Sequence, residues 1–187
     1  MSSLMVSAKA SEMKENTSIE KDRRSSDMAQ LESLYRRYVA RVYTLCLRLL
    51  ATVQTAEEAT AQVFIRLSRE LANWWDETHT LARLRELAID ESLSRVWRGK
   101  SQKRAPTVTT SQTPAHPGSV SPPPLNQAAL DALSAKLPND LRVAFVLRDR
   151  EGLSNGAIAA HLKISEEEVR RLISVARLDL RRLWLGQ

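Results

Sequence analysis

Residues 154–176, SNGAIAAHLKISEEEVRRLISVA, decide the fold of the C-terminal part of this chain. Ser154 is a favoured first residue for a short helix, "KI" turns the chain, and Ser165 begins a second helix. Small Ala159 lets the two helices cross closely. Apolar residues around the turn fix the crossing angle: Ile158, Leu162, Ile164, Val169, Leu172 and Ile173. This spacing predicts a helix-turn-helix whose second helix projects into a DNA major groove, whereas an ordinary helical hairpin is the alternative.

The second of these helices opens with three glutamates, although DNA repels negative charge. Glu166 complements the helix dipole, and Glu168 is predicted to complete a capping box with Ser165. Among these acids only Glu167 lies on the outward face, where it accepts from a cytosine amino group, discourages binding to wrong sequences, or is simply solvated. The helical wheel and the basic character of the helix give these DNA-binding candidates: Glu167, Arg170, Arg171, Ser174 and Arg177.

Composition favours helix and a polyanionic partner. The 187 residues are rich in Leu, Ala, Arg and Glu, contain only 5 glycines and carry a formal net charge of +6. A net positive charge of this size favours a nucleic acid as the binding partner over a membrane. The lone Cys46 excludes an internal disulfide and is predicted to be a buried, reduced thiol. Without a signal peptide or a long apolar run, the protein is expected to be soluble and cytoplasmic.

The chain divides into two helical blocks. Residues 1–27 are polar and charged and predict a disordered tail, and the Pro-rich stretch 100–124 predicts a flexible linker. Residues 28–99 and 125–187 are the two blocks, so the expected fold class is all-α, with two small domains.

Three helices are expected in the first block. Apolar residues at steps of three and four form one face of a long first helix. Thr55 and Glu58 predict a capping box that begins the second helix, whose buried face ends at Leu71. The third helix, 80–98, has apolar residues on several sides. A basic run follows on it and supplies three further DNA-binding candidates: Arg95, Arg98 and Lys100.

Enzymatic function is not expected. The three histidines are scattered, and no CxxC, HExxH, P-loop or GxSxG motif is present. Adjacent carboxylates such as Glu57 and Glu58 point in different directions on a helix and cannot share a substrate. No catalytic residue, metal ligand or cofactor is therefore predicted.

Both blocks together resemble a known family. LYRRYVARVYTLCLRLL, TAEEATAQVF and LPNDLRVAFVLRDREGLSNGAIAAHLKISEEEVRRLISVARLDLRR follow the pattern of bacterial RNA polymerase sigma factors of the extracytoplasmic-function group. The resemblance implies that residues 28–99 form a region 2-like domain that binds core RNA polymerase and the −10 element. It also implies that residues 125–187 form a region 4-like domain that reads the −35 element of promoter DNA. Members of the family are often held by an anti-sigma factor.

The resemblance also implies a polymerase-binding surface at Glu57, Glu58 and Gln62, where glutamine replaces a family acid. The third helix departs from the family pattern, because its tryptophan is missing and Asp90 stands where the family has Asn. Trp74 and Trp75 either stack on an unpaired base or anchor the second and third helices.

Two alternatives to a sigma factor stay open. One is a stand-alone helix-turn-helix regulator that binds an operator without polymerase. The other is a sigma-derived adaptor that binds polymerase but opens no promoter, which the divergent third helix and the missing acid keep open.

Overall fold

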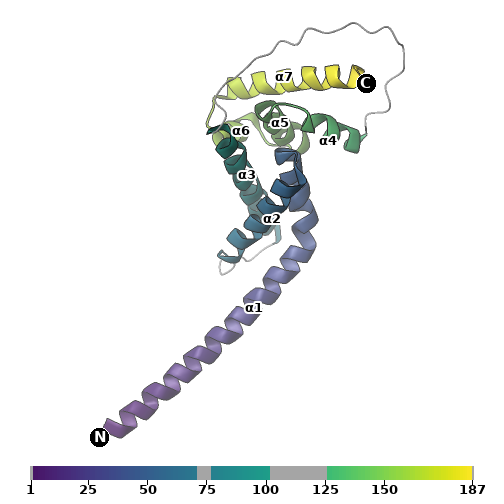
Figure 1. Cartoon of the computed structure of the whole chain (residues 1–187). Coiled ribbons are helices and arrows are strands. Elements are labelled where there is room, and N and C mark those ends of the chain that lie inside the picture. Colours follow the sequence, from purple (N-terminus) through teal and green to yellow (C-terminus); the bar gives the residue numbers. More distant parts are fainter. Residues whose placement is uncertain (1, 71–76, 102–125, 187) are drawn as a thin grey trace.

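Every element in the described part of the chain is a helix, which confirms the all-α prediction (Figure 1). The computed structural model describes the backbone of residues 2–70, 77–101 and 126–186, and the side chains of residues 25–70, 79–98 and 126–186. Trp74, Trp75, Leu71 and nearly all of the predicted linker lie outside these residues.

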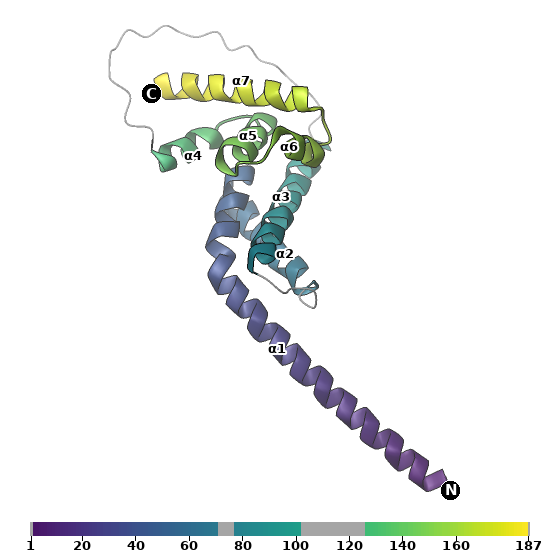
Figure 2. The same ribbon diagram turned by 180° about the vertical axis from the view of Figure 1, so that it is seen from behind.

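The first helix, α1 (Ser2–Leu50), is much longer than expected. Its N-terminal part projects away from the rest of the molecule in both ribbon views (Figures 1 and 2). The sequence predicted a disordered tail over 1–27, whereas α1 is continuous from Ser2. Residues 1–27 contain no glycine or proline, the residues that most disfavour the interior of a helix.

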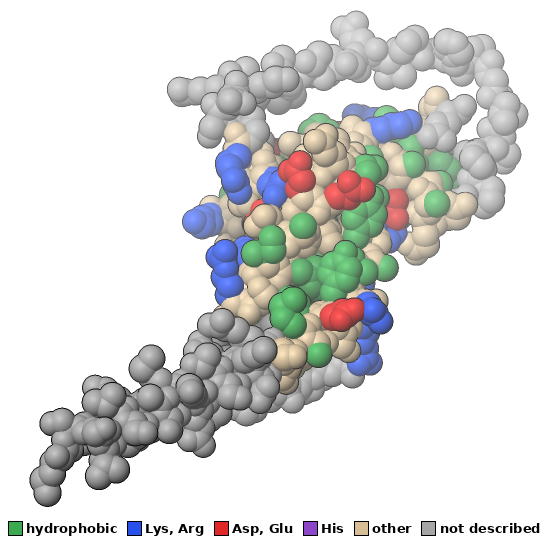
Figure 3. All heavy atoms as spheres, turned by 60° about the horizontal axis from the view of Figure 1, so that its bottom comes forward, with side chains coloured by type: hydrophobic (Ala, Val, Ile, Leu, Met, Phe, Trp, Pro, Cys, Tyr) green, Lys and Arg blue, Asp and Glu red, His purple; other side chains and the backbone are tan. Residues whose placement is uncertain are grey.

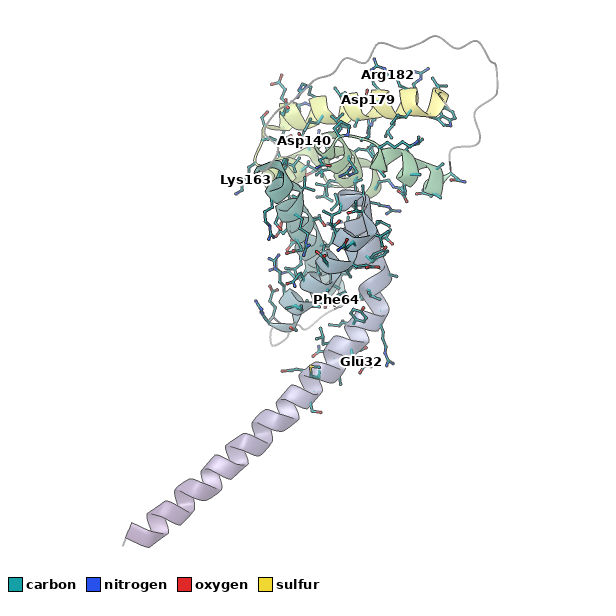
Figure 4. The ribbon with its side chains drawn as sticks, in the orientation of Figure 1. Glu32, Phe64, Asp140, Lys163, Asp179 and Arg182 are labelled. Atoms are coloured by element: carbon teal, nitrogen blue, oxygen red, sulfur yellow. The ribbon has the colours of Figure 1, made fainter. Side chains whose placement is uncertain are left out.

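Helices α1, α2 (Val53–Ser68) and α3 (Glu77–Ser101) form the N-terminal domain. The Tyr35 and Phe64 rings meet edge to face with centroids 4.8 Å apart, and Phe64 projects toward α1 (Figure 4). Seen from the end where α1 projects, hydrophobic side chains form a band on this face, acidic side chains lie beside it, and basic side chains lie mainly toward the margins of the molecule (Figure 3). Helix α3 is buried on more than one side, as predicted, through Leu84, Leu87, Ala88, Ile89, Leu93 and Val96.

The predicted capping box of α2 is wrong. Thr52 is the N-cap, and its side chain makes no capping hydrogen bond. The Thr55 hydroxyl donates instead to the Thr52 carbonyl oxygen at 3.2 Å. Thr55 therefore lies in the first turn of α2, and the helix begins about one turn earlier than predicted. Glu58 consequently has no capping role and is free to pair elsewhere, as described below.

The C-terminal domain contains α4 (Gln127–Ala135), α5 (Asn139–Phe145), η2 (Val146–Arg150), α6 (Asn155–Leu162) and α7 (Glu166–Leu185). Segment η2 is a π-helical turn that continues α5, and the Glu151 amide closes it on the Val146 carbonyl oxygen at 3.0 Å. Gly152 then adopts φ +70°, a left-handed conformation that suits glycine and follows the end of the helix.

The two domains are in contact, and a single apolar cluster runs through both of them. Cys46 lies in this core with no exposed surface. Burial raises the pKa of its thiol above the ordinary value, since the thiolate would lose its hydration. The prediction of a buried, free cysteine is therefore confirmed.

Candidate nucleic-acid interface

The helix-turn-helix forms as the sequence predicted. The Ser154 side chain accepts from the Ala157 amide at 3.1 Å, and the Ser165 side chain accepts from the Glu168 amide at 3.1 Å. Lys163 connects the helices at φ 56°, and the Ile164 amide donates to the Ala159 carbonyl oxygen at 3.2 Å. Figure 4 places Lys163 at this turn. Two side-chain caps and a left-handed residue thus fix the entry of α7.

One face of α7 is buried and holds the helix against α5. Val169, Leu172, Ile173 and Ala176 are at most 9% exposed, and α5 is the principal contact of α7. Val169, Leu172 and Ile173 are among the apolar residues that were predicted to fix the crossing angle of the two helices. Because this face is fixed, the opposite face of α7 is presented outward along the upper edge of the molecule (Figure 1).

Three of the predicted DNA-binding residues are exposed on α7 and have no hydrogen-bond or ion-pair partner within the described part of the chain. They are Glu167, Arg170 and Ser174. Arg170 therefore offers a guanidinium that is available to phosphate or base edges.

The other two candidates on α7 are already paired. Arg171 donates to both carboxylate oxygens of Glu168, with Nε–Oε2 at 2.8 Å and Nη2–Oε1 at 2.5 Å. Arg177 donates to both oxygens of Asp149, with Nε–Oδ2 at 2.9 Å. These hydrogen bonds lower the pKa of Glu168 and raise the pKa of Arg177. To contact DNA, each arginine must either leave its carboxylate partner or bind DNA while still paired with it.

The predicted capping box at α7 is half right. The Ser165 hydroxyl oxygen caps the Glu168 amide, but the Glu168 carboxylate goes to Arg171 and not back to the Ser165 amide. Glu166 lies over the start of α6, where a side chain at Gly156 would come within 3.1 Å of its Oε1 atom. The charge of all three glutamates remains in the first turn of α7, where it complements the helix dipole.

The basic candidates on α3 are not a free cluster. Arg95 Nη1 donates to Glu58 Oε2 at 2.8 Å, and Arg95 Nε donates to Glu91 Oε1 at 2.9 Å. Arg98 donates to the Ser94 carbonyl and hydroxyl oxygens. Lys100 lies in α3, but its side chain is outside the described residues.

The three residues of the predicted polymerase surface are exposed on α2: Glu57, Glu58 and Gln62. Glu57 and Gln62 have no hydrogen-bond partner in the part of the chain that the structure describes, whereas Glu58 is tied to Arg95 of α3. The structure therefore distinguishes Glu57, which is open, from Glu58, whose charge is shared inside the domain.

Sequence reasoning missed several long-range polar contacts that join the domains. Arg48 of α1 donates to both oxygens of Asp131 of α4 at 3.1 and 3.2 Å. Arg142 is 5% exposed, and its guanidinium donates to the Leu49 carbonyl oxygen at 3.1 Å. These partners are 83 and 93 residues apart, so no local pattern could have paired them. The anomaly at Asp90 was a usable signal, because its carboxylate faces His161 of α6 at 3.4 Å.

Residues 127–180 match the family model described as sigma-70, region 4. The chain is also 31% identical over 159 residues to the ECF RNA polymerase sigma factor SigE of Mycolicibacterium smegmatis, covering 82% of this chain and 61% of that protein. The chain resembles an extracytoplasmic-function sigma factor. This confirms the resemblance drawn from the sequence motifs. The chain spans about three fifths of the length of that curated relative.

A solved structure supports the fold. The sigma factor RpoE of Bartonella quintana, crystallised in complex with the anti-sigma factor NepR, matches with a TM-score of 0.54 at 17% identity, over 82% of this chain and 96% of that one. Within the described residues, none of the helices is long and apolar enough to cross a membrane, and no group of three or more His, Cys, Asp or Glu side chains is placed to hold a metal ion.

Proposed function

We propose that this protein is a sigma factor that binds core RNA polymerase and directs promoter-specific transcription initiation. The observation that carries the proposal is the similarity to SigE over 159 residues, because a match of that length involves more than the region 4 segment. The outward face of α7, with its unpartnered Arg170, supports a role of this helix in reading duplex DNA. The protein supplies positioning and recognition, and the polymerase supplies the chemistry.

In this proposal the domains keep the roles that the family resemblance implies. Residues 28–99 bind polymerase and the −10 element, and residues 125–187 bind the −35 element. The open carboxylate of Glu57 suits a basic polymerase surface, because opposite charges favour encounter and register. The Bartonella quintana relative was crystallised with an anti-sigma factor, and a partner of that class is part of the proposal.

Run-off transcription with purified core polymerase tests the proposal. A sigma factor gives promoter-specific transcripts that are absent without the protein. Binding to an operator-like duplex without any effect on core polymerase would instead identify a stand-alone regulator. Binding to polymerase with no transcript on any promoter would identify an adaptor, the alternative that the divergent third helix favours. The cytoplasm, where the polymerase acts, is the corresponding location.

A further inference from the structure

A cleft of about 500 Å³ lies between α1 and α3 and is bounded on a third side by Arg150 of η2 and by Glu151. Helices α1 and α3 pack against each other beneath the C-terminal domain (Figure 1). The volume falls in the range of small-molecule sites in proteins, about 300–1,000 Å³. No described residue that lines the cleft belongs to α7, so the cleft is separate from the outward face of the recognition helix.

Two walls of the cleft are each one stripe of a helix. The members of each stripe are three or four residues apart: Arg41, Leu45 and Arg48 on α1, and Leu81, Arg85 and Ala88 on α3. Residues at this spacing share one face of a helix. Arginines and apolar residues therefore alternate on both walls.

The floor of the cleft is apolar and its rim is basic. Val42, Leu45 and Leu84 line the cleft and are at most 5% exposed. Arg41 and Arg85 line it as well, but they are exposed. An apolar surface with a few polar groups converging on it is the usual composition of a small-molecule site.

The two arginines at the rim are available to a ligand. Arg41 and Arg85 have no hydrogen-bond or ion-pair partner among the described residues. A guanidinium presents its donors in a fixed planar fork that matches the oxygens of a phosphate group. Single surface arginines are ordinarily only solvated, but these two come from different helices and converge on one concavity.

Two further arginines add positive charge inside the cleft. Arg48 donates to both oxygens of Asp131, and Arg150 Nη2 donates to Asp131 Oδ1 at 3.0 Å. Arg48 Nη1 also lies 3.8 Å from Glu151 Oε1. The Arg150 side chain is 8% exposed, and its buried Nε atom has no hydrogen-bond acceptor in the described structure. The arginines of the cleft therefore outnumber these two carboxylates, and an anion would offset the excess where salt screens it less than at the surface.

The spacing of the arginines bears on the size of the anion. Arg41 and Arg48 are seven residues apart, which is about 10 Å along a helix. An oligophosphate can reach more of the arginines at once than a single phosphate can. The apolar floor can in addition contact a base. A DNA duplex, whose major groove alone is about 12 Å wide, is too large for the cleft.

We propose that this cleft binds a small molecule of nucleotide size that carries at least two adjacent phosphate groups. Arg41 and Arg85 bind the phosphates, Arg48 and Arg150 supply positive charge behind them, and the apolar floor contacts the base. The site is a property of the free chain and does not depend on the sigma function.

Isothermal titration calorimetry on the full-length protein tests the site, with inorganic phosphate, pyrophosphate, ADP and GDP as probes at matched ionic strength. Pyrophosphate should bind more tightly than phosphate, because it reaches more guanidinium groups. ADP or GDP should bind more tightly than pyrophosphate, because the base covers the apolar floor. Absence of binding by all four probes would overturn the site. Nucleotides that bind no more tightly than pyrophosphate would overturn the nucleotide assignment.

Arg85→Ala and Arg41→Ala should each weaken pyrophosphate binding by about tenfold or more, since each removes a charge-assisted hydrogen bond. Both side chains are exposed, so circular dichroism should show no loss of folding. Arg69→Ala is the matched control, because Arg69 of α2 is exposed and lies outside the cleft. It makes the same change in net charge and should leave the affinity unchanged. Equal losses for Arg69→Ala and Arg85→Ala would show that binding follows net charge and not the cleft.

Glu151→Gln should have the opposite sign. It is nearly isosteric and removes a carboxylate that competes with phosphate for Arg48, so pyrophosphate should bind about threefold more tightly. An unchanged or weaker affinity for a folded Glu151→Gln protein would remove Arg48 from the site.

The phosphate backbone of DNA is the alternative occupant of these arginines. Anisotropy of a labelled promoter-length duplex, with and without saturating pyrophosphate at matched ionic strength, distinguishes the two. Duplex affinity should not change with pyrophosphate or in Arg85→Ala. A loss of duplex affinity in Arg85→Ala as large as its loss of pyrophosphate affinity would assign the arginines to nucleic acid and overturn the small-molecule site. Failure of run-off transcription with normal pyrophosphate binding would reject the sigma function and retain the cleft.

Discussion

Arg171 and Glu168, one turn apart on α7, form a bidentate pair in which the arginine donates at 2.8 and 2.5 Å. Glu168 thus holds the side chain of a residue that was predicted to bind DNA. Glu168, at the start of the recognition helix, makes two separate contacts. Its backbone amide donates to the Ser165 hydroxyl oxygen, and its carboxylate orients Arg171.

Arg171→Ala should weaken binding to a −35-type duplex by about 1–3 kcal/mol, the value expected for loss of a base or phosphate contact. Glu168→Gln should have the opposite sign, because it removes the charge that competes with DNA for the arginine. Fluorescence anisotropy at several salt concentrations measures both. Equal affinities for the parent protein and Arg171→Ala would place this arginine outside the interface.

The capping geometry predicts different stability effects at Ser165 and Glu168. Ser165→Ala removes the acceptor for the Glu168 amide and should destabilise the protein by about 0.5–2 kcal/mol. Glu168→Ala keeps that amide and its acceptor, so the loss should be clearly smaller. Urea denaturation compares them. An equal or larger loss for Glu168→Ala would mean that the carboxylate, and not the serine, stabilises the start of α7.

Replacement of the buried Arg142 should strongly lower the stability of the protein. Arg142→Ala would leave the carbonyl oxygens of Leu137 and Leu49 without a donor and open a cavity, so we expect a loss of about 3 kcal/mol. Burial lowers the pKa of this guanidinium below its ordinary value, because the charged form loses hydration. Thermal denaturation monitored by circular dichroism provides the measurement. A loss below about 0.5 kcal/mol, the range of ordinary surface changes, would contradict a structural role.

Glu57→Arg tests whether Glu57 binds polymerase or only stabilises α2. Glu57 is exposed and has no partner in the described structure, so folding should change by only a few tenths of a kcal/mol. Against a basic polymerase surface, however, the introduced arginine repels, and pull-down by core polymerase should fall sharply. Gln62→Glu, which adds back an acid, should strengthen the pull-down. Normal recovery of a folded Glu57→Arg protein would shift support to the stand-alone regulator.

Cys46 should react slowly with iodoacetamide in the folded protein. The thiol is inaccessible, and burial raises its pKa, so the reactive thiolate forms only at a pH above the ordinary value for cysteine. Labelling measured by mass spectrometry across pH 7–10 should lag behind that of the urea-unfolded chain at every pH. Equal rates would place the thiol at the surface.

Local patterns predicted local structure well. The helix-turn-helix followed from Ser154, Ser165 and the apolar spacing around the turn, and the buried face of α7 followed from its period. The cap of α2 was misplaced because Thr52 and Thr55 are both plausible starting residues, and only the backbone decides between them. For residues 2–27, polar composition does not by itself decide between tail and helix, because the stretch lacks glycine and proline.

Long-range pairing could not be predicted in the same way. Arg95 looked like a free DNA contact, but Glu58 lies 37 residues earlier and meets it only once α2 and α3 pack together. Arg48 and Asp131 lie in different domains. Such partners are specified by tertiary structure, so net charge along a segment overstates how many of its cations are available to DNA.

The π-helical turn over Val146–Arg150 makes chain length more important there than side-chain identity. One residue of an ordinary helix corresponds to a rotation of about 100°, and this segment directs Asp149 to Arg177 while Arg150 faces Asp131. Substitutions at exposed positions of the turn should therefore be tolerated during evolution. A deletion of a single residue would rotate everything that follows, and would separate both pairs at once. Relatives that retain these two pairings should show no gap across this segment.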